Sequence, residues 1–499
     1  MKRFIAYLII FIAGLTGCSE KIDQPKPKPD TQPSDTTAVP DTGQTPEKED
    51  WPADKRGKSY IWDDENIPEI HISINKTEWN NLLTNADKML AITDFSKCDV
   101  TFTKAGEDTQ TQNVAIRLYE NRPFSRPEGS AGESHKKDSP KWHFSSYELD
   151  FSKYDQKQTL RDVRRLRLKP CYNDPTYIRE KFCHDTFVAA GIWTVPKISF
   201  CRVWIHVSGD SSPAYLGVYQ MVESIDDAYL KERIVPLMGS TSGNLWRCSN
   251  RGTLLSAAFL KDNAASISAD LSEAKDYNYT LKTNLAGYHS AETQIKDFIN
   301  KVNTLKNEEF KKWISSVMDM SLMLKTMAMD ISVGNTDNYW CTGNNYYIYF
   351  TGKSTDNYKV FYIPGGFEMS LGSIHSMSKI EDSGTRDIIS WGNYNGVLMS
   401  KILSIEEFKI EYMLYLEDFI YDDGLLKPSK AKQRAKSLTE RIEAYTSNDT
   451  GERNIISDLP TPNTAGFSKY RLWKDGATNF FEEKASAVEQ YILDYMPMP

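Results

Sequence analysis

The sequence lacks the features of a nucleic-acid-binding protein. Its 499 residues include 60 lysine and arginine residues against 68 aspartate and glutamate residues, giving a formal net charge of −8 at pH 7. No long run of lysine and arginine reverses that balance locally. Because nucleic-acid surfaces are marked by basic patches or stripes, we expect no nucleic acid among its partners. The acidic charge favours solubility and identifies no substrate.

Three common catalytic motifs are also absent. The chain contains no G-x-S-x-G segment, no H-E-x-x-H pair and no Walker-type phosphate loop. This argues against an α/β-hydrolase, a zincin and a P-loop NTPase, because each chemistry needs those residues at that spacing. The histidines are scattered, and His71 and His206 lie in alternating strand patterns, so we interpret them as structural residues rather than metal ligands.

Closely spaced cysteine pairs are missing too, so no zinc site is indicated. Apart from Cys18, the cysteines are Cys98, Cys171, Cys183, Cys201, Cys248 and Cys341. Their spacings form no disulfide framework, and we expect buried free thiols. Disulfides remain the alternative, because an exported protein can form them.

A single long apolar run is present, and it lies at the N-terminus. Lys2 and Arg3 precede the apolar stretch Phe4–Leu15, which is too short to span a membrane as a mature helix. The run ends in LTGC, which resembles a bacterial lipobox and predicts an acylated Cys18 after cleavage. Residues 1–18 are therefore predicted to be a lipoprotein signal peptide; the alternative is a plain secretory signal with an incidental cysteine.

The segment after the signal predicts a tether. Residues 19–54 are dominated by proline, aspartate, threonine, lysine and glutamine, a composition too polar to form a core. Several acyl chains on Cys18 would anchor this disordered tether stably to a membrane. We therefore expect a cell-envelope lipoprotein at the outer membrane, facing the periplasm or the surface.

Residues 55–235 predict a β-rich lobe. Alternating apolar residues predict strands at 70–74, 100–102, 114–116, 166–168, 203–207 and 216–222. One prominent helix is expected between them, with Asp174 as N-cap, Pro175 as its first residue and Gly191 as the residue that ends it. The stretch from Tyr119 to Lys141 shows no periodicity and predicts a long loop.

Residues 236–499 predict a mainly helical lobe. Helical spacing is found at 292–302, 311–333, 405–421 and 429–445. A short β region lies within this lobe at 346–363, with strands at 346–350 and 360–363. No internal repeat is present.

Asp337 and the pair Asn344–Asn345 are the strongest candidates for chemistry. They lie just before the apolar strand at 346–350, in the segments GNTDNYW and NNYYIYF. An acid on such a loop can orient a substrate hydroxyl, and an amide oxygen can hold Mg²⁺ beside a transferred phosphate. The same residue types also form ordinary turns, so spacing alone leaves a structural turn as the alternative.

Several further segments, taken in order, resemble the CotH (spore coat protein H) kinase family. The matching segments are LRLK at 166–169, DPTYIRE at 174–180, GVYQMVESID at 217–226, GNLWR at 243–247, and Asp337 with NNYY at 344–347. The resemblance extends over residues 70–416. It implies an α+β, atypical protein-kinase-like fold with a β-rich N-terminal lobe, a helical C-terminal lobe and ATP bound between them.

The resemblance also implies roles for individual residues. Lys169 would meet the ATP phosphates, and Glu180 would pair with a lysine as the helix glutamate does in other kinases. Glu223 would lie near the adenine-side connection between the lobes. Asp337 would orient the acceptor hydroxyl, and Asn344 or Asn345 would coordinate the metal. Read without the resemblance, Lys169 and Glu180 would be surface charges.

Two segments depart from the family pattern. The family's metal-binding segment I-P-x-D-[FY]-D reads IPGGFE here, so the first acid has become Gly366 and the second Glu368. A glycine cannot ligate Mg²⁺, although Glu368 could reach the metal by another path. After Arg117, a further expected cofactor-binding residue, the family glycine is replaced by Glu120, whose carboxylate would repel phosphates.

These departures favour a degraded, pseudokinase-like member that acts by binding a surface partner or glycan. The first alternative is an active Ser/Thr protein kinase that uses Asp337 and Glu368 with ATP and Mg²⁺. The second is a glycan-binding adhesin without a nucleotide site. Exposed aromatic residues would suit sugar stacking, although aromatics more commonly fill cores. The residues considered for it are Tyr339, Trp340, Trp391 and Tyr394.

Overall fold

The computed structural model describes the chain from residue 57 to residue 495 with internal gaps. The described ranges are 57–87, 94–119, 126–128, 142–171, 174–255, 267–268, 277–392, 396–421, 423–460, 468–474 and 478–495. All of them belong to one compact unit, Pro52–Pro499. Cys18, the expected signal and tether, Glu120, Tyr394 and most of the expected long loop lie outside the described residues. Across the described part of the chain, no helix is long and apolar enough to cross a membrane.

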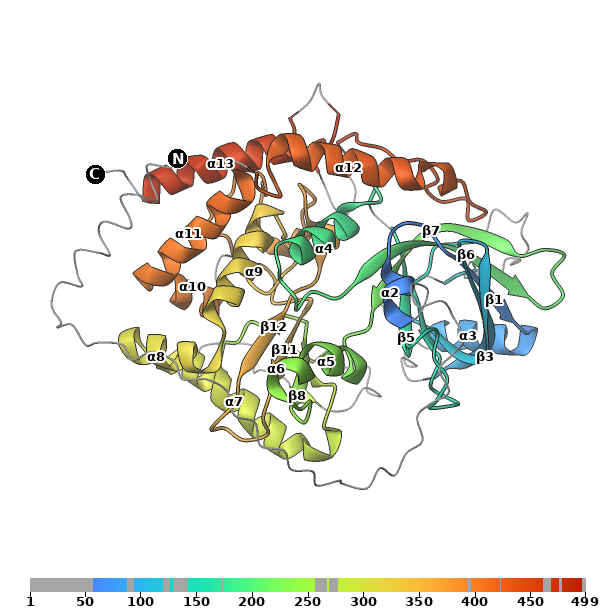
Figure 1. Cartoon of the computed structure of the whole chain (residues 1–499), viewed down its shortest axis with the longest axis horizontal. Coiled ribbons are helices and arrows are strands. Elements are labelled where there is room, and N and C mark those ends of the chain that lie inside the picture. Colours follow the sequence, from blue (N-terminus) through green and yellow to red (C-terminus); the bar gives the residue numbers. More distant parts are fainter. Residues whose placement is uncertain are drawn as a thin grey trace, which may run out of the picture. The chain divides into compact units, whose positions relative to one another are not determined.

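The first part of this unit is a closed β-barrel (Figure 1), in the strand order β1-β2-β3-β4-β5-β7-β6. Its strands are β1 (Glu69–Ile74), β2 (Ser96–Lys104), β3 (Glu107–Leu118), β4 (Tyr147–Asp150), β5 (Arg165–Pro170), β6 (Ile198–Val207) and β7 (Ala214–Glu223). Neighbours are antiparallel, except that β1 pairs in parallel with β6 and so closes the barrel. Closure leaves no unpaired sheet edge.

Alternation places apolar side chains inside the barrel and charged ones outside. In β5, Leu166 and Leu168 belong to the barrel core, whereas Arg167 and Lys169 between them are only half-buried. Two short helices accompany the barrel, α2 (Gly57–Trp62) and α3 (Lys76–Asp87), and Trp79 of α3 is fully buried in its core. The expected strands and the hairpin of β2 and β3 are confirmed.

Helix α4 (Arg179–Ala189) follows β5 and starts later than predicted. Tyr177 has φ 64°, a left-handed conformation that cannot continue a helix, so residues 174–178 form a turn. Asp174 stabilises this turn instead of capping a helix at Pro175, since its carboxylate accepts from the backbone N–H groups of Thr176 and Arg179. The predicted C-terminal end is confirmed, because Gly191 has φ 74° directly after the helix.

The second part contains a sheet larger than the predicted β region, in the order β12-β11-β8-β10-β9. Its strands are β8 (Asn244–Cys248), β9 (Ile267–Ser268), β10 (Tyr279–Leu281), β11 (Tyr346–Phe350) and β12 (Val360–Ile363). The bounds of β11 and β12 agree with the prediction, whereas β8 to β10 were not predicted. Gly243 precedes β8, and a Cβ there would lie 1.8 Å from the Phe350 carbonyl oxygen, so only glycine permits this close strand approach.

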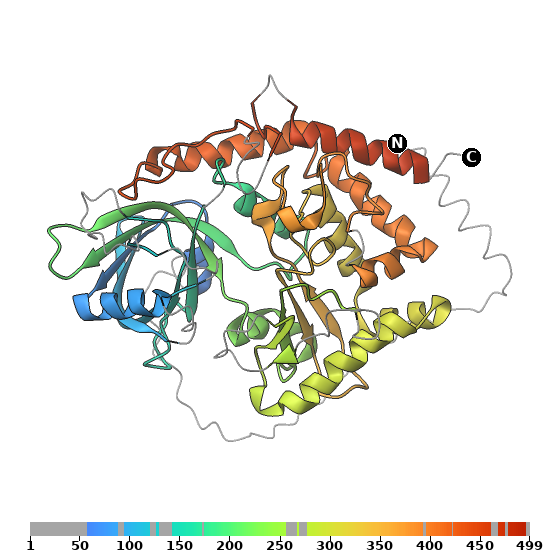
Figure 2. The ribbon, with the colours of Figure 1, turned by 180° about the vertical axis from the view of Figure 1, so that it is seen from behind.

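Helices surround this sheet (Figures 1 and 2). They are α5 (Asp227–Arg233), α6 (Val235–Met238), α7 (Tyr288–Thr304), α8 (Asn307–Val317), α9 (Met320–Ser332), α10 (Val397–Leu403), α11 (Glu406–Ile420), α12 (Pro428–Ile442) and α13 (Phe480–Tyr495). The predicted single helix 311–333 is wrong, because Met318 is extended and Asp319 starts α9 as its N-cap, accepting from the Leu322 N–H at 3.0 Å. The chain is therefore α+β.

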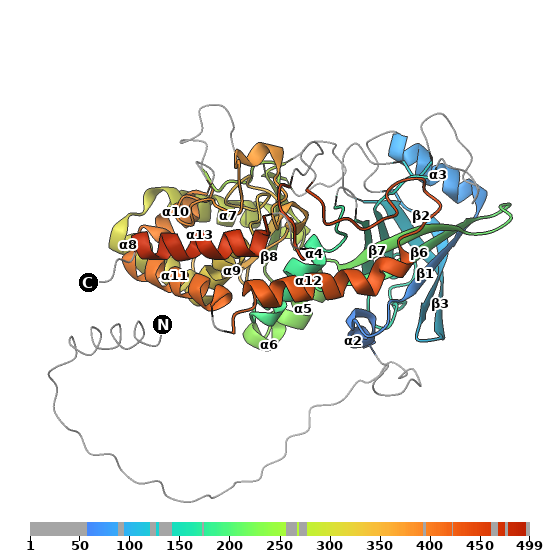
Figure 3. The ribbon, with the colours of Figure 1, turned by 90° about the horizontal axis from the view of Figure 1, so that it is seen from above.

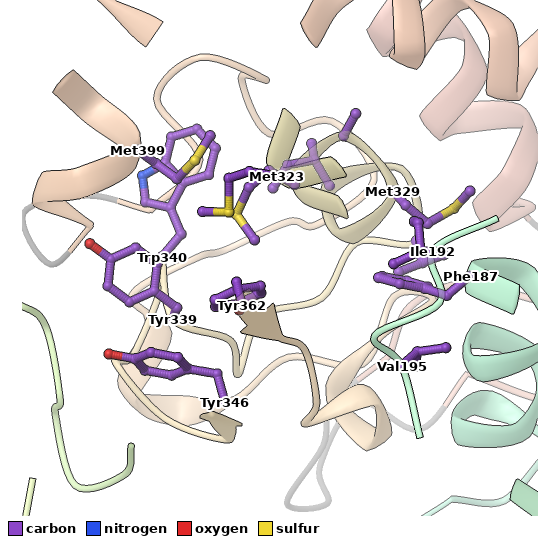
Figure 4. Packing of buried hydrophobic residues seen from close by; sticks show 14 of the residues in the cluster. Phe187, Ile192, Val195, Met323, Met329, Tyr339, Trp340, Tyr346, Tyr362 and Met399 are labelled. Atoms are coloured by element: carbon purple, nitrogen blue, oxygen red, sulfur yellow. The ribbon is translucent and has the colours of Figure 1, made fainter. Parts of the chain in front are cut away.

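One large core joins these helices to α4 and to one face of the sheet. Figure 4 shows part of it, where Tyr339, Tyr346 and Tyr362 gather below Trp340 and Met399. The Tyr339 and Tyr346 rings lie 5.1 Å apart. Trp391 is also fully buried, so the described aromatic residues considered for sugar stacking are core residues. The six cysteines predicted to be buried free thiols are confirmed as such.

The C-terminal part connects the barrel to this core. Figure 3 shows α13 and α12 running in succession over α11 and α4. The segment after α12 then reaches β7, where the Tyr215 hydroxyl donates to the Tyr445 carbonyl oxygen at 2.6 Å and the Asp449 N–H donates to the Tyr215 carbonyl oxygen at 2.8 Å. These contacts attach the segment after α12 to β7 of the barrel.

Candidate functional site

A cleft of about 760 Å³, including its open mouth, lies between the barrel and the second sheet. The barrel side contributes Tyr119, Arg167 and Lys169 to the lining, and α4 contributes Glu180. The opposite side is lined by Arg247, Asn345, Tyr346, Tyr347, Gly366 and Glu368.

Lys169 is the charged centre of the cleft. It projects from the outer face of β5, and its Nζ lies 3.0 Å from the Glu180 carboxylate and 3.3 Å from that of Glu368. Burial by itself would raise the pKa of Glu368, but the charge and hydrogen bond of Lys169, a backbone hydrogen bond and the charge of His375 together lower it. The ammonium is thus shared by two carboxylates from opposite sides of the cleft.

Asp337 lies on the loop between α9 and β11, here named the Asp337 loop (residues 334–345). Its carboxylate accepts hydrogen bonds from Asn345 Nδ2 at 2.7 Å, from Thr342 Oγ1 at 2.8 Å and from Asn344 Nδ2 at 3.3 Å. Burial raises the pKa of Asp337 to about 6; the neighbouring charge of Glu368 also raises it, and His375 opposes the shift. The predicted acid and its two amides are therefore neighbours.

A second buried carboxylate, Asp330, fixes the Asp337 loop from below. It is fully buried at the end of α9 and accepts from the side-chain amides of Asn335 and Asn338, each at 2.9 Å. Asn335 Oδ1 in turn accepts from the Asp337 backbone N–H at 3.0 Å. Because burial dominates, the pKa of Asp330 is raised to about 7. Asp330 thus determines where the Asp337 backbone lies.

Sequence reasoning missed Asp330 and His375. An acid in the otherwise apolar stretch of α9 was a visible signal for Asp330. His375 had no local signal, because it reaches Asp337 from 38 positions later in the chain, with its Nε2 3.9 Å from Asp337 Oδ2. The backbone N–H of His375 donates to Thr336 Oγ1 at 2.9 Å, and this bond holds the residue beside the Asp337 loop.

Gly366 occupies a position that excludes any side chain. Its φ is 76°, and a Cβ would lie 2.5 Å from the Asp337 carbonyl oxygen and 2.8 Å from Asn345 Cβ. The departure from the family aspartate is thus accompanied by close backbone packing against the Asp337 loop. Glu368 follows two residues later, in the 3₁₀ turn η3 (Phe367–Met369), and its carboxylate enters the cleft.

Two other predicted residues are held in ion pairs. Glu223 lines the cleft, but its carboxylate is already hydrogen-bonded. It accepts from both terminal nitrogens of the Arg233 guanidinium, at 3.0 and 2.6 Å, and from the Lys197 backbone N–H at 2.9 Å. Arg117 donates to Glu148 at 2.5 Å and lies just outside the cleft lining. Asn344 turns partly away, because its Oδ1 accepts from the Arg251 N–H at 3.1 Å.

The residues present fit a Mg²⁺ ion that is held jointly with phosphates. Within the described ranges, no group of three or more histidine, cysteine, aspartate or glutamate residues could hold a metal by itself. Mg²⁺ typically takes one or two protein carboxylates and completes its shell with water and substrate phosphates. Glu368 would supply such a carboxylate and Asn345 an amide oxygen, since both line the cleft.

Two comparisons with known proteins relate to this arrangement. Residues 131–494 match the family model described as CotH kinase protein. The chain is also 25% identical over 312 residues to the inner spore coat protein H of Bacillus subtilis (strain 168), an alignment that covers 62% of this chain and 76% of that protein. The family match includes Lys169, Glu180, Asp337 and Glu368.

Proposed function

The chain belongs to the CotH kinase protein family, and from that membership we propose that it transfers a phosphoryl group from ATP to a protein hydroxyl. In this proposal the barrel is the N-terminal lobe of an atypical protein-kinase-like fold, and the second sheet with its helices is the C-terminal lobe. One observation carries it: Lys169 contacts Glu180 and Glu368 in a cleft also lined by Asn345, the partner of Asp337.

Lys169 would bind the donor phosphates as a point charge. Its pairing with Glu180, which is buried on α4, fixes the position of the ammonium. The Glu368 carboxylate contacts the same ammonium, at 3.3 Å. Arrival of a phosphate would release Glu368 from Lys169, because the phosphate competes for the same donor.

The released Glu368 and Asn345 would hold the metal. A bound Mg²⁺ neutralises charge on the transferring phosphoryl group. Glu368 then takes the place of the acid that is missing at Gly366. Its carboxylate is one methylene longer than aspartate, which suits a residue placed two positions further along the chain.

Asp337 would orient the acceptor hydroxyl and accept its proton. Three hydrogen bonds fix the direction of its carboxylate. With a pKa raised to about 6, it is mostly ionised at pH 7 and still basic enough to receive a proton. Thr342, Asn344 and Asn345 donate to it without supplying charge, so the carboxylate keeps its basicity.

A degraded nucleotide site is the second candidate function. The observation that favours it is Gly366, whose packing against the Asp337 carbonyl oxygen leaves no room for a metal-binding side chain. The chain would then bind a partner protein without transferring phosphate. The glycan-binding alternative has no comparable support, since Tyr339, Trp340 and Trp391 are buried.

Phosphate incorporation from labelled ATP separates the two candidates. We expect the full chain with Mg²⁺ to label itself or a generic protein substrate, and Asp337→Asn to slow labelling by about 10²- to 10⁴-fold, the usual worth of a positioned acid–base group. Asp356→Asn, a change of the same chemistry at an exposed position, is the matched control. Equal labelling by wild type and Asp337→Asn would contradict the proposed role.

We also propose that Cys18 is acylated and that residues 19–54 tether the domain to a cell-envelope membrane. The support is the lipobox-like segment LTGC and the polar composition after it. Labelling of the expressed chain with a palmitate analogue tests this. The analogue should be incorporated into wild type and not into Cys18→Ala.

A further inference from the structure

A group of cationic side chains lies in and next to the cleft that contains Lys169. Arg117 on β3, Glu148 on β4 and Arg167 on β5 are directly opposite one another in the strand register, and all three point out of the barrel. Arg247 on β8 faces them from the second sheet, and both it and Arg167 line the cleft. The proposed phosphoryl transfer uses none of these residues.

The arginines on the barrel are held in place. The Arg167 guanidinium lies 4.2 Å from the Tyr119 ring centroid, and that of Arg117 lies 4.6 Å from the Phe95 ring centroid. The anion between them, Glu148, is buried and contacts Arg117 at 2.5 Å and Arg167 at 3.6 Å. One carboxylate is thus shared by two guanidiniums, and neither needs to reorganise to receive a further anion.

Lys282 adds an ammonium to this group. It follows β10, where its backbone N–H donates to the Leu245 carbonyl oxygen at 2.8 Å, and its side chain is half-buried. Thr280 is opposite Arg247 in the register of β10 and β8, so Lys282, two residues further on, lies on the same face of the sheet as Arg247. Among the residues that the structure describes, no hydrogen bond or ion pair involves its Nζ. Burial lowers the pKa of Lys282 to about 7; Arg247, Arg167 and Arg117 lower it further, and Glu148 opposes them.

Such an arrangement costs folding free energy unless an anion occupies it. A partly desolvated ammonium among guanidiniums is unfavourable, because both burial and like charge disfavour its charged form. A phosphate or carboxylate placed between Lys282 and Arg247 would supply Lys282 with a counter-charge and accept charge-assisted hydrogen bonds from both side chains.

We propose that Arg167, Arg247 and Lys282 form an anion-binding subsite that takes a phosphate or carboxylate group. This proposal rests on the proposed function, since it makes the subsite a second recognition point for the reactants. Arg167 and Lys169 lie two residues apart on one face of β5, which separates them by about 7 Å. The reactants therefore carry one anionic group at Lys169 and another at the subsite, either on an acidic acceptor or on the donor's own phosphate chain.

Binding of inorganic phosphate to the full chain tests the subsite directly. Phosphate should bind the wild type, and Lys282→Gln and Arg247→Gln should each weaken its affinity by about 10- to 100-fold, the worth of one charge-assisted hydrogen bond. Lys312→Gln, at an exposed position on α8, is the matched control and should bind like wild type. An affinity within twofold of wild type in either subsite variant would overturn the proposal.

A thermal measurement separates a binding role from a structural one. Without phosphate, Lys282→Gln should raise Tm by about 1 °C or more, because it removes a poorly solvated charge from among cations. Phosphate should then raise the Tm of wild type and not that of the variant. A Tm lowered by Lys282→Gln would assign this residue to the fold and contradict the proposal.

The source of the anion follows from the same titration with a non-hydrolysable ATP analogue and Mg²⁺ present. Phosphate that still binds assigns the subsite to an acidic acceptor, and phosphate that is displaced assigns it to the donor; both support the subsite. Phosphate binding requires neither Mg²⁺ nor transfer. A chain that binds phosphate through Lys282 but transfers no phosphoryl group would thus contradict the proposed function alone.

Discussion

Glu148 in the barrel and Asp330 below the Asp337 loop are both buried carboxylates, with exposed fractions of only 3% and 0%. Burial raises the pKa of Asp330 to about 7, because its partners are the neutral amides of Asn335 and Asn338. Burial alone would also raise the pKa of Glu148, but the positive charges of Arg117, Arg167 and Arg165 together outweigh burial, and the pKa is lowered. When two carboxylates are about equally buried, the charge of their partners decides whether the pKa is raised or lowered.

The contrast reflects how each side of the cleft is built. On the barrel side, strand register alone places Arg117, Glu148 and Arg167 opposite one another. On the other side, the Asp337 loop is not part of a β-sheet. Hydrogen bonds of buried amide side chains with the buried Asp330 carboxylate and with the loop backbone position its residues instead. The first side is fixed by backbone pairing and the second by side chains, so single substitutions should act more strongly on the second.

Removal of Asp330 should produce the largest effect. Asp330→Ala leaves the amides of Asn335 and Asn338 buried without an acceptor, which should cost about 2–5 kcal/mol of the free energy of unfolding. Urea unfolding measures this, with exposed Asp356→Ala as the control, expected within about 0.5 kcal/mol of wild type. A loss below about 1 kcal/mol for Asp330→Ala would mean that the loop does not depend on this carboxylate.

Glu148→Gln tests the barrel side and should have a smaller cost. The arginines are partly solvated and held by strands, so we expect a loss of about 1–3 kcal/mol in the same urea experiment. Inorganic phosphate should meanwhile bind more tightly than to wild type, because the competing anion is gone. Weaker phosphate binding by Glu148→Gln would show that the cations around it do not act on a bound anion.

Much of the barrel side was predictable from sequence, and much of the other side was not. Alternation predicted β5, and resemblance predicted that Glu180 pairs with a lysine, here Lys169 at 3.0 Å. The parallel pairing of β1 with β6, which closes the barrel, joins distant segments and leaves no local pattern. The row of Arg117, Glu148 and Arg167 depends on the register of β3, β4 and β5, so composition and spacing could not reveal it.

The misses on the other side have local physical causes. The turn before α4 depends on Tyr177 at φ 64°, a conformation that no sequence pattern indicates for tyrosine. The break between α8 and α9 depends on Asp319, which reads equally well as a surface acid within one long helix. The contact of His375 with Asp337 requires the folded segment after η3.

Gly366 and Gly191 allow a matched test of close packing on the Asp337 loop. Both have a left-handed backbone, with φ 76° and 74°, but a Cβ would meet Asp337 at Gly366 and nothing within 4 Å at Gly191. Both alanine variants should lose about 1 kcal/mol to backbone strain, and Gly366→Ala about 1–2 kcal/mol more. Equal losses in thermal unfolding would mean that the loop moves aside freely.

The pH dependence of stability should show opposite signs for the two carboxylates. In the folded protein the pKa of Asp330 lies above its ordinary value of 3.8, so its contribution to stability is present below that pH and is lost as pH rises to about 7. The folded pKa of Glu148 lies below its ordinary value of 4.5, so its contribution to stability is present above that pH and is lost in acid. For Asp330 the effect should amount to about 4 kcal/mol.

Urea unfolding of wild type, Asp330→Ala and Glu148→Gln at several pH values between 3.5 and about 7.5 checks these signs. The difference between wild type and Asp330→Ala should shrink as pH rises, and that between wild type and Glu148→Gln should grow as pH rises from the acid end. Parallel curves for all three proteins would contradict the opposite shifts.

Calorimetric titration of a non-hydrolysable ATP analogue, with and without Mg²⁺, tests most directly whether Glu368 completes a working phosphoryl-transfer site. We predict that Mg²⁺ tightens binding to wild type by about tenfold or more, and that Glu368→Gln abolishes this gain while exposed Glu381→Gln keeps it. Nucleotide binding that is absent, or equally strong with and without Mg²⁺ in the wild type, would contradict the account.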